Sequence, residues 1–314
     1  MIKSIKRNLV APILNGFGLP GLILKNATNK KLILNYHGVT NHCHPEINPR
    51  HMDARQFEGH LLFLKKNFQI LPLQDLFKAE IRKDEKPGVA LTFDDGYLDN
   101  YSVALPLLEK HRIPATFFII TQGLSTSGYR TWYDRVDFLN RMGKVPVFAK
   151  DVLNLKKAGT RRDSILNDLE EPLRNELEVL YSKTPDYWKL MEAEHIGKLA
   201  RNPLIEIGSH TVNHYNLPFL KNEEIEEELL TSKKQLENVI QKEVLSIAYP
   251  EGDYSEAIKK SAENCGYSFQ LAVDYRVPSD KIDARIRNRF SISNTTNLAS
   301  NKILMARALN SAGF

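Results

Sequence analysis

The stretch from Val89 to Tyr97, VALTFDDGY, decides the fold. Its first five residues are apolar or β-branched and predict a strand buried on both faces. The strand ends in two adjacent carboxylates, Asp94 and Asp95. Asp-Gly is a common turn pair, which would account for Asp95 but leaves Asp94 unexplained. Two carboxylates this close repel each other unless a cation or a shared proton intervenes, so the pair indicates a functional site at a strand end.

Further buried strands alternate with helices along most of the chain. Strands are expected at about residues 31–36, 69–71, 89–93, 115–120, 204–207, 244–249, 268–273 and 286–291, and helices at about 53–66, 73–81, 97–111, 221–241 and 298–309. Strands that alternate with helices form a parallel sheet with both faces covered. About seven strands over this length favour an α/β barrel over an open sheet, and functional side chains of such barrels gather where strands end.

The alternation stops between about residues 123 and 201. This region is mostly helical and polar, with amphipathic helices expected at 163–182 and 186–200. We interpret it as a helical insertion in a barrel that spans residues 31–314, because it lacks the strand pattern of a second α/β domain.

Composition excludes some classes of protein. An apolar fraction of 42% is enough for a large core, and the net charge of +5 is modest. Six basic and no acidic residues lie in the first 35 positions, which leaves the rest of the chain near neutral and without the basic balance of a nucleic-acid-binding protein. Cys43 and Cys265 are far apart and favour free thiols in a reducing compartment. The His42-Cys43-His44 run lacks a second ligand cluster for a metal.

The N-terminal segment, residues 1–30, combines the basic start MIKSIKRN with the uncharged stretch LVAPILNGFGLPGLIL. Gly and Pro interrupt that stretch and no small-residue cleavage site follows, which disfavours a cleaved signal and a membrane span. Apolar side chains at positions 2, 5, 9 and 13 can share one helical face beside three basic residues. Residues 1–25 therefore predict either a helix on an anionic membrane surface or a helix packed on the protein body.

The stretch GSHTVNH at 208–214 also follows an expected strand. If Ser209 caps a helical turn, His210 and His214 lie at i and i+4 on one face, a spacing that suits two imidazoles on one metal ion. One residue of the acidic pair would complete a site of two His and one carboxylate, while the other stays free as a base. A metal in such a site lowers the pKa of its water and polarises a carbonyl, so the sequence predicts a hydrolase.

Three motifs, TFDDGY at 92–97, GSHTVNH at 208–214 and AYPEGDYS at 248–255, resemble the first three motifs of the polysaccharide deacetylase family (NodB homology, carbohydrate esterase family 4). The stretches LILNYHGV at 32–39 and PATFFI at 114–119 support the resemblance, which covers roughly residues 31–120 and 190–292. The resemblance implies a distorted (β/α)7 barrel and metal-dependent removal of N- or O-acetyl groups from sugars.

The resemblance also implies roles for individual residues. By motif position, Asp94 would be the general base, and Asp95, His210 and His214 would bind a divalent cation. The resemblance favours Zn²⁺, and Co²⁺, Ni²⁺ or Mn²⁺ would also suit the site.

The chain departs from the family pattern in three places, one of which is Glu251, where many members have an aromatic residue after the Pro. The Arg that braces the catalytic Asp in the third motif is replaced by Ala248, and the late Leu-x-x-His motif that carries the general acid is missing. We hypothesise that His37, at the end of the first strand, supplies the acid; a turn His bonded to the backbone is the alternative. Arg289 could brace Asp94 in place of the lost Arg or bind substrate, or it could form an ordinary ion pair with Asp274.

The third motif supplies the expected substrate-binding surface. The predicted substrate contacts are Tyr249, Pro250, Glu251, Gly252 and Arg289. The backbone NH at Glu251 would be an oxyanion donor. At the start of the insertion, Tyr129, Trp132 and Tyr133 could stack on a sugar ring or pack in a core.

These expectations converge on a hydrolase that removes an acetyl group from an N-acetylated sugar or glycan in bacterial-type polysaccharide or glycoconjugate biosynthesis. A cytoplasmic enzyme at the inner membrane surface would suit a lipid-linked or nucleotide-linked sugar. Two alternatives stay open: an amidohydrolase that acts on a C–N bond outside sugars, and a glycan-binding protein on a catalytically decayed scaffold, which the missing Arg and His motivate.

Overall fold

A computed structural model of the chain describes residues 11–12, 16, 19–25, 29–42, 50–126, 128–143, 149–183, 188–292 and 296–311. In these residues, one parallel sheet has the strand order β10-β9-β8-β7-β6-β5-β1-β11, with β4 paired to β5 off this path. The strands are β1 (Lys31–Tyr36), β4 (Gln69–Ile70), β5 (Gly88–Phe93), β6 (Ala115–Ile119), β7 (Ile205–Ser209), β8 (Ser246–Ala248), β9 (Phe269–Ala272), β10 (Ile286–Asn288) and β11 (Phe290–Ser291). A separate pair, β2 (Gly38–Thr40) and β3 (His51–Asp53), lies beside the sheet.

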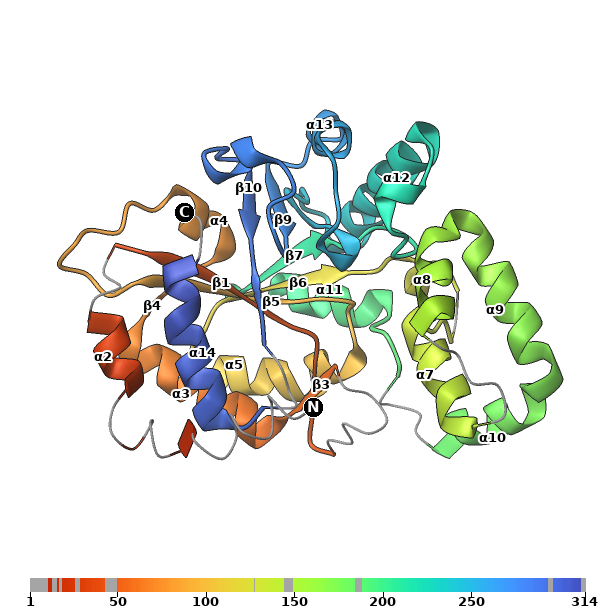
Figure 1. The fold of residues 1–314 in the computed structure, drawn as a ribbon, viewed down its shortest axis with the longest axis horizontal. Helices are drawn as coiled ribbons and strands as arrows, with labels where there is room; N and C mark the ends of the chain where they lie inside the picture. The colour runs from red at the N-terminus through yellow and green to blue at the C-terminus, as the bar shows by residue number, and fades with distance from the viewer. Residues whose placement is uncertain are drawn as a thin grey trace.

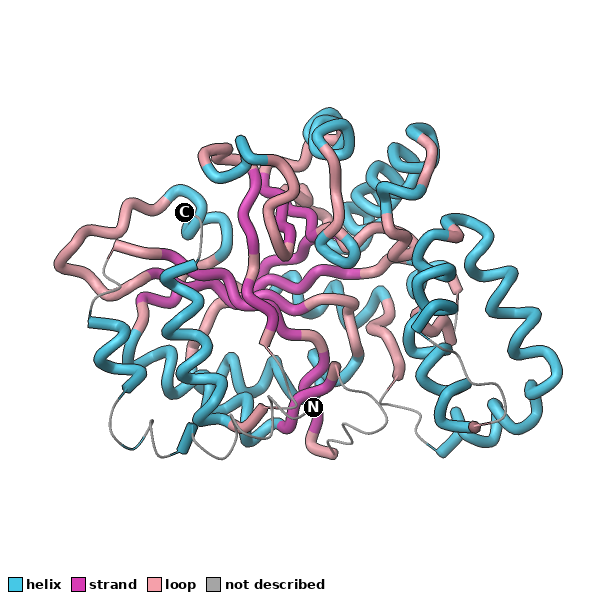
Figure 2. The backbone as a smooth tube through the Cα atoms, viewed as in Figure 1, coloured by secondary structure: helices cyan, strands magenta, loops and turns pink. Residues whose placement is uncertain are grey.

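One short segment closes the sheet into a barrel. β10 pairs with β9 on one side, with Ile286 opposite Gln270, and β11 pairs with β1 on the other, with Phe290 opposite Leu34. If β10 and β11 count as one strand interrupted at Arg289, seven strands surround the barrel. The predicted distorted (β/α)7 barrel is therefore confirmed, and Figure 2 shows the strands gathered at its centre.

Helices cover the outside of the barrel (Figure 1). They are α3 (Ala54–Asn67), α4 (Leu73–Lys78), α5 (Leu105–His111), α11 (Ala193–Arg201), α12 (Asn222–Ile240), α13 (Glu256–Asn264) and α14 (Leu298–Ser311), with a π-helical turn at Asn100–Ala104 before α5. Asp53 caps α3 as the sequence predicts, because its side chain accepts the backbone NH of Arg55 at 2.9 Å. The strands and helices predicted for the barrel are present, with ends that differ by a few residues. The predicted helix over 163–182 is instead interrupted at Glu171–Leu173, and the one over 186–200 begins at Ala193.

The layer between the barrel strands and the surrounding helices is packed with aromatic rings. All six residues of β5 are buried, as the apolar run predicts. Phe93 stacks on Tyr36 and on Phe117, with ring centroids 5.3 and 4.7 Å apart. These contacts hold β1, β5 and β6 together directly beneath the ends of the strands.

Four helices form the insertion at the right of Figure 1: α7 (Trp132–Met142), α8 (Ala149–Lys157), α9 (Arg162–Glu170) and α10 (Arg174–Lys183). A short helix, α6 (Gln122–Ser125), precedes them. The insertion has its own buried apolar cluster, which includes Trp132, Phe138, Leu166, Leu177 and Trp188. It is therefore a small helical unit with a core separate from that of the barrel.

The insertion ends earlier than the predicted boundary at about residue 201. α11 lies inside the predicted range, but its buried residues Ile196 and Leu199 belong to the barrel core, and the helix packs on β7 and α12. The sequence pattern could not separate α11 from the insertion, because both are amphipathic helices and only the partner of the apolar face differs.

The described part of the N-terminal segment packs on the protein body. α2 (Leu19–Lys25) contacts α14, and Leu24 joins the barrel core. The residues that would form the predicted membrane-binding face lie mostly outside the described part, as do Cys43 and His44. Within the described ranges, no helix combines the length and the apolar character that crossing a membrane requires.

Gly208 of β7 gives a test of the packing beneath the site. A Cβ at this position would lie 2.4 Å from Cε1 of Phe118 and 2.7 Å from Oγ of Ser246. Because over-packing a core typically costs about 1–3 kcal/mol, Gly208→Ala should lower the free energy of unfolding in urea by that amount. The control is Gly197→Ala in α11, where the nearest atom would be 3.9 Å away. It should be neutral or stabilising by up to about 1 kcal/mol. Equal stability of the two variants would contradict this packing.

Candidate active site

A cleft of about 420 Å³ opens where the barrel strands end. It is lined by most of the side chains that the sequence singles out: His37, Asp94, Asp95, His210, His214, Tyr249, Glu251, Gly252 and Arg289. Pro250 is buried beside the cleft and does not line it. The fold therefore collects residues from five strand ends into one site, as expected for an α/β barrel.

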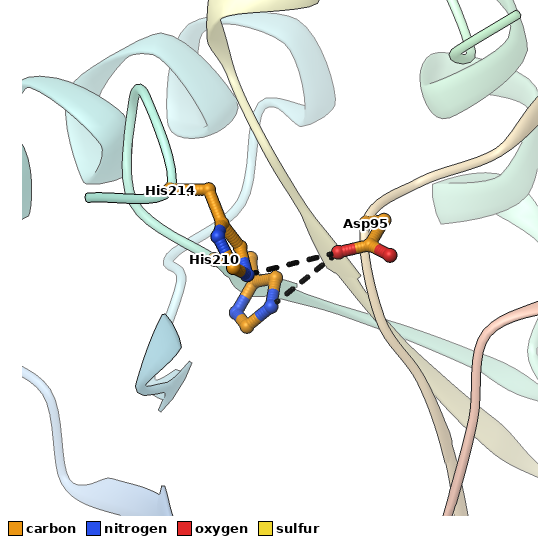
Figure 3. Close-up of side chains that lie close together, drawn as sticks. All are labelled: Asp95, His210 and His214. Atoms are coloured by element: carbon orange, nitrogen blue, oxygen red, sulfur yellow. Dashed lines mark ion pairs between the residues drawn. The ribbon is translucent and has the colours of Figure 1, made fainter. Parts of the chain in front are cut away.

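Asp95, His210 and His214 form a group that could hold a metal ion (Figure 3). One ligand atom from each lies within 4.8 Å of the others, and all three side chains are buried. The Nε2 atoms of His210 and His214 lie 3.6 and 3.9 Å from Oδ1 of Asp95. Metal–ligand bonds of about 2.0–2.2 Å place donor atoms roughly 3–4 Å apart around a zinc ion, so the donor set fits such a cation.

His210 is oriented by the third motif. Its Nδ1 lies 2.7 Å from the carbonyl oxygen of Ala248. Because a carbonyl oxygen can only accept, Nδ1 carries the proton and Nε2 keeps its lone pair on the side of Asp95. A metal-binding His is usually oriented in this way, by a hydrogen bond from the ring nitrogen that does not bind the metal.

The two His residues come together through a loop, and the predicted helical spacing is wrong. β7 runs through Ser209, and His210 to His214 follow as turns and loop. Thr211 and His214 adopt left-handed φ angles of 66° and 54°, which fold the loop back on itself. Glu228 of α12 fixes the loop, because its carboxylate accepts two backbone NH groups at 3.0 and 2.9 Å. His210 and His214 are therefore close because the loop folds back on itself, and not because of a helical i, i+4 spacing.

Asp95 is a buried carboxylate on a left-handed backbone, and burial disfavours its charged form. It has a left-handed φ of 73° and is 1% exposed. Burial raises its pKa to about 6, and the adjacent charge of Asp94 acts in the same direction, while His210 lowers it. A cation bound at this position would stabilise the ionised carboxylate, which agrees with its place in the donor group.

Asp94 lies in the opposite environment. Nη1 and Nη2 of Arg289 donate to Oδ1 and Oδ2 of Asp94 at 2.7 and 2.8 Å, and Nδ2 of Asn35 donates to Oδ2 at 3.0 Å. Burial alone would raise the pKa of Asp94. The guanidinium of Arg289 and the nearby His210 instead hold this pKa well below its usual range. Asp94 is therefore ionised at neutral pH.

Arg289 braces Asp94 from the break between β10 and β11. The resemblance leads us to expect an Arg at the position of Ala248, and the guanidinium comes from this other strand. Of the expectations for Arg289, contact with Asp94 is the one the structure shows, and no ion pair with Asp274 occurs among the described residues. Its side chain is 1% exposed, which leaves little surface for the predicted substrate contact.

His37 lines the cleft and is half-buried. Burial lowers its pKa to about 4; Asp94 opposes this effect, and Arg50 and Arg289 add to it. His37 is therefore neutral at pH 7. The position of His37 in the cleft suits the predicted proton donor. Its low pKa does not, because a donor must carry the proton before the reaction.

The third motif reaches the cleft mainly through Glu251. The hydroxyl of Tyr249 donates to Gln270 at 2.7 Å and its side chain is fully buried, so the predicted contact between this side chain and substrate is disfavoured. Glu251 has a left-handed φ of 58° and pairs with Lys156 of α8. This ion pair joins the barrel to the insertion across the edge of the cleft.

The insertion forms one wall of the cleft. Trp132 and Tyr133 both line it, but Trp132 is only 3% exposed, and Tyr129 lies outside it. The ring of Tyr133 meets that of His214 edge to face, with centroids 5.2 Å apart. Of the residues predicted to stack on a sugar or pack, Trp132 therefore packs, and Tyr133 packs on a donor His while facing the cleft.

Asn35 and Arg50 are the site residues that sequence reasoning missed. Asn35 is the one polar side chain inside the apolar run LILNY, a signal that could have identified it. Arg50 reaches two acidic residues of α7, Asp134 and Asp137, and its guanidinium lies 4.5 Å from the ring centroid of Tyr133. Nothing in the sequence around Arg50 indicates this contact.

Comparisons with known proteins agree with this geometry. The family model for polysaccharide deacetylases matches residues 81–270. The protein YxkH of Bacillus subtilis (strain 168), whose name refers to the same family, is 24% identical over 246 residues, which are 77% of this chain and 64% of YxkH. A poly-β-1,6-N-acetyl-D-glucosamine N-deacetylase of Staphylococcus aureus is 34% identical over 111 residues, which are 31% of this chain and 38% of the relative. The chain thus spans less than two thirds of either relative.

Solved structures share the fold. IcaB from Ammonifex degensii superposes with a TM-score of 0.60 at 17% identity and covers 89% of this chain and 97% of its own. The Streptococcus pyogenes deacetylase PplD, solved in complex with acetate, gives 0.58 at 19% identity and covers 87% and 96%. Because the family model spans more than half of the chain and the barrel is that of these deacetylases, the chain belongs to the polysaccharide deacetylase family.

Proposed function

We propose that this protein is a metal-dependent hydrolase that removes an acetyl group from an N-acetylated sugar or glycan in polysaccharide or glycoconjugate biosynthesis. The observation that carries the proposal is the juxtaposition of two carboxylates with different partners. Asp94 is held ionised by Arg289, and Asp95 is buried beside two His residues that could share a cation with it. A base next to a cation site is the arrangement that amide hydrolysis needs.

Asp95, His210 and His214 would hold the cation, and this set of nitrogen and oxygen donors suits Zn²⁺, with Co²⁺, Ni²⁺ or Mn²⁺ as alternatives. When bound, such an ion polarises the acetamide carbonyl and lowers the pKa of its water. Asp94 would be the base that accepts a proton during hydrolysis. Three hydrogen bonds occupy three of the roughly four acceptor positions of its carboxylate, which leaves one for the proton.

The substrate would be an acetamido sugar in the cleft between the strand ends and the insertion. The similarity to the staphylococcal poly-β-1,6-N-acetyl-D-glucosamine N-deacetylase supports an N-acetylglucosamine unit. A lipid-linked or nucleotide-linked form of the sugar, met at the inner membrane surface by a cytoplasmic enzyme, stays part of the proposal and rests on the basic, apolar composition of residues 1–25.

The alternative of a decayed glycan-binding protein loses its main support in the structure. The missing Arg of the third motif suggested decay, yet Arg289 makes a two-pronged ion pair with Asp94 from a different strand. A protein that only binds glycans has no need for a braced carboxylate beside a group of metal-binding side chains. A substrate panel that includes non-sugar amides would separate the deacetylase from the amidohydrolase alternative.

Metal content tests the donor group without knowledge of the substrate. Elemental analysis of the purified protein should find about one zinc-like ion per chain, and Asp95→Ala and His210→Ala should each lose it, because removal of one of three ligands leaves too few donors. Asp137→Asn is the matched control: it lines the same cleft but pairs with Arg50, so it should keep its metal. Wild-type protein without metal after reconstitution would contradict the proposal.

Asp94→Asn tests the base. The variant should bind metal like the wild type and lower kcat by about 10²- to 10⁴-fold, the usual contribution of a general base. Acetate release from β-1,6-linked N-acetylglucosamine oligomers, or from a fluorogenic acetyl ester, measures the loss. A variant that keeps its turnover would exclude Asp94 as the base.

Arg289→Met extends the same test to the pH profile. Asp94 must be ionised to accept a proton, and Arg289 keeps its pKa low. Without the guanidinium, burial raises that pKa, so the acid limb of kcat/KM should move to higher pH. The neighbouring Arg287 instead donates to the carbonyl of Ile286 at 2.7 Å, so Arg287→Met should leave the limb in place.

His37→Gln tests the proposed proton donor. The variant should lower kcat/KM by about 10²-fold or more. A donor must start protonated, so a pKa of about 4 also predicts a wild-type kcat/KM that falls as the pH rises above 4. Undiminished turnover of the variant, or a wild-type profile that is flat from about pH 5 to 8, would remove His37 from the acid role.

A further inference from the structure

A buried arginine of the insertion contacts the loop that carries His214. Arg162, the first residue of α9, is 2% exposed. Its Nη1 donates to the carbonyl oxygen of His214 at 2.9 Å, and its Nη2 donates to that of Asn213 at 2.7 Å. The two prongs of one guanidinium thus bind consecutive peptide groups, one of which belongs to a proposed metal ligand.

This position is costly for a cation. The guanidinium carbon lies 4.5 Å from the ring centroid of Tyr215 and 5.2 Å from that of Trp132. A positive charge in the first turn of α9 also opposes the helix dipole. Burial of a charge is unfavourable unless hydrogen bonds compensate for it, and here the carbonyls of the loop provide them.

The loop around His214 is held from two sides. Glu228 of the barrel helix α12 accepts the NH groups of Val212 and Asn213, and Arg162 of the insertion binds the carbonyls of Asn213 and His214. Between these contacts the backbone of His214 is left-handed, a conformation that a residue with a side chain adopts only when its surroundings enforce it.

Barrel strands position the other two donors, although the hydroxyl of Tyr133 in the insertion also contacts the Asp95 carboxylate. Asp95 directly follows β5, and His210 follows β7 and is oriented by the carbonyl of Ala248 in β8. His214 differs, because both its backbone and its ring contact the insertion: Arg162 binds its carbonyl, and Tyr133 packs on its imidazole.

We propose that Arg162 is a positioning residue that fixes the left-handed loop presenting His214, so that the helical insertion is a component of the metal site and not only a wall of the cleft. This inference rests on the proposed function, because it requires a cation at Asp95, His210 and His214. It follows that cation affinity and the docking of α9 are linked, since each stabilises the conformation that the other needs.

The experiment compares Arg162→Met with Arg135→Met in the full chain. Arg135 of α7 is also largely buried, but its Nε and Nη2 bind Glu170 at 2.9 and 2.7 Å, and it does not contact the His214 loop. Both variants lose a buried guanidinium of the insertion, and only one of them loses the contact with the metal loop. The measurements are the Kd for Zn²⁺ by competition with a chromophoric chelator, the visible spectrum of the Co²⁺ form, and the Tm of the metal-free protein.

Arg162→Met should raise the Kd for Zn²⁺ by about 10- to 100-fold, as loss of a group that orients a metal ligand typically does, and should alter the Co²⁺ spectrum. Arg135→Met should lower the Tm of the metal-free protein and leave the Kd within about twofold of wild type. Equal affinity of Arg162→Met and wild type would overturn the inference, and so would an equal loss in both variants, which would indicate general destabilisation of the insertion.

Arg162→Lys covers the case in which Arg162→Met does not fold. Lysine keeps the charge but cannot bind two carbonyls in the fixed fork of a guanidinium, so its Kd should lie between those of wild type and Arg162→Met. Wild-type affinity in a folded Arg162→Lys would overturn the two-pronged role. If the wild-type protein itself bound neither Zn²⁺ nor Co²⁺, the metal part of the proposed function would fail and this inference with it, an outcome distinct from failure of the inference alone.

Discussion

The two-pronged ion pair between Arg289 and Asp94 is the contact on which the rest of the structure depends. It joins the end of β5 to the break between β10 and β11, the segment that closes the barrel. Both side chains are buried, and loss of one partner of a buried ion pair typically costs about 3–5 kcal/mol because it leaves the other charge without compensation. Closure of the barrel and the ionised state of the proposed base therefore share one interaction.

That ion pair also makes the pKa values of two neighbouring carboxylates differ. Asp94 receives three hydrogen bonds from cationic and amide donors, and its pKa is held low, whereas burial raises the pKa of Asp95 to about 6. Two adjacent acids in one site are useful when their surroundings push them apart in this way, because each can then take a different role. The pair that looked unfavourable in the sequence is accommodated by an arginine for one acid and by two imidazoles for the other.

The sequence predicts those parts of the molecule that depend on local pattern. The alternation of strands and helices gave the barrel, and acids and imidazoles placed after strands gave the site. Contacts that depend on tertiary closure were harder to predict. The contact between Arg289 and Asp94 was only one of several alternatives for Arg289, because the sequence does not contain the distances between strands. The left-handed Thr211 and His214 were missed for a related reason: neither is glycine, and the contacts that enforce their conformation come from α12 and α9.

The barrel and the insertion divide the cleft unequally. The strand ends supply every group proposed to take part in the chemistry, and the insertion supplies a wall through α7 and α8, closed at one edge by the ion pair of Lys156 and Glu251. Apart from Tyr133, which packs on His214, a change of substrate could therefore be made on the cleft face of α7 and α8 without a change in the base or the donor group. The first turn of α9 cannot be substituted as readily, because Arg162 holds the loop of His214. The insertion can vary where it faces the substrate, but it is constrained where it supports the site.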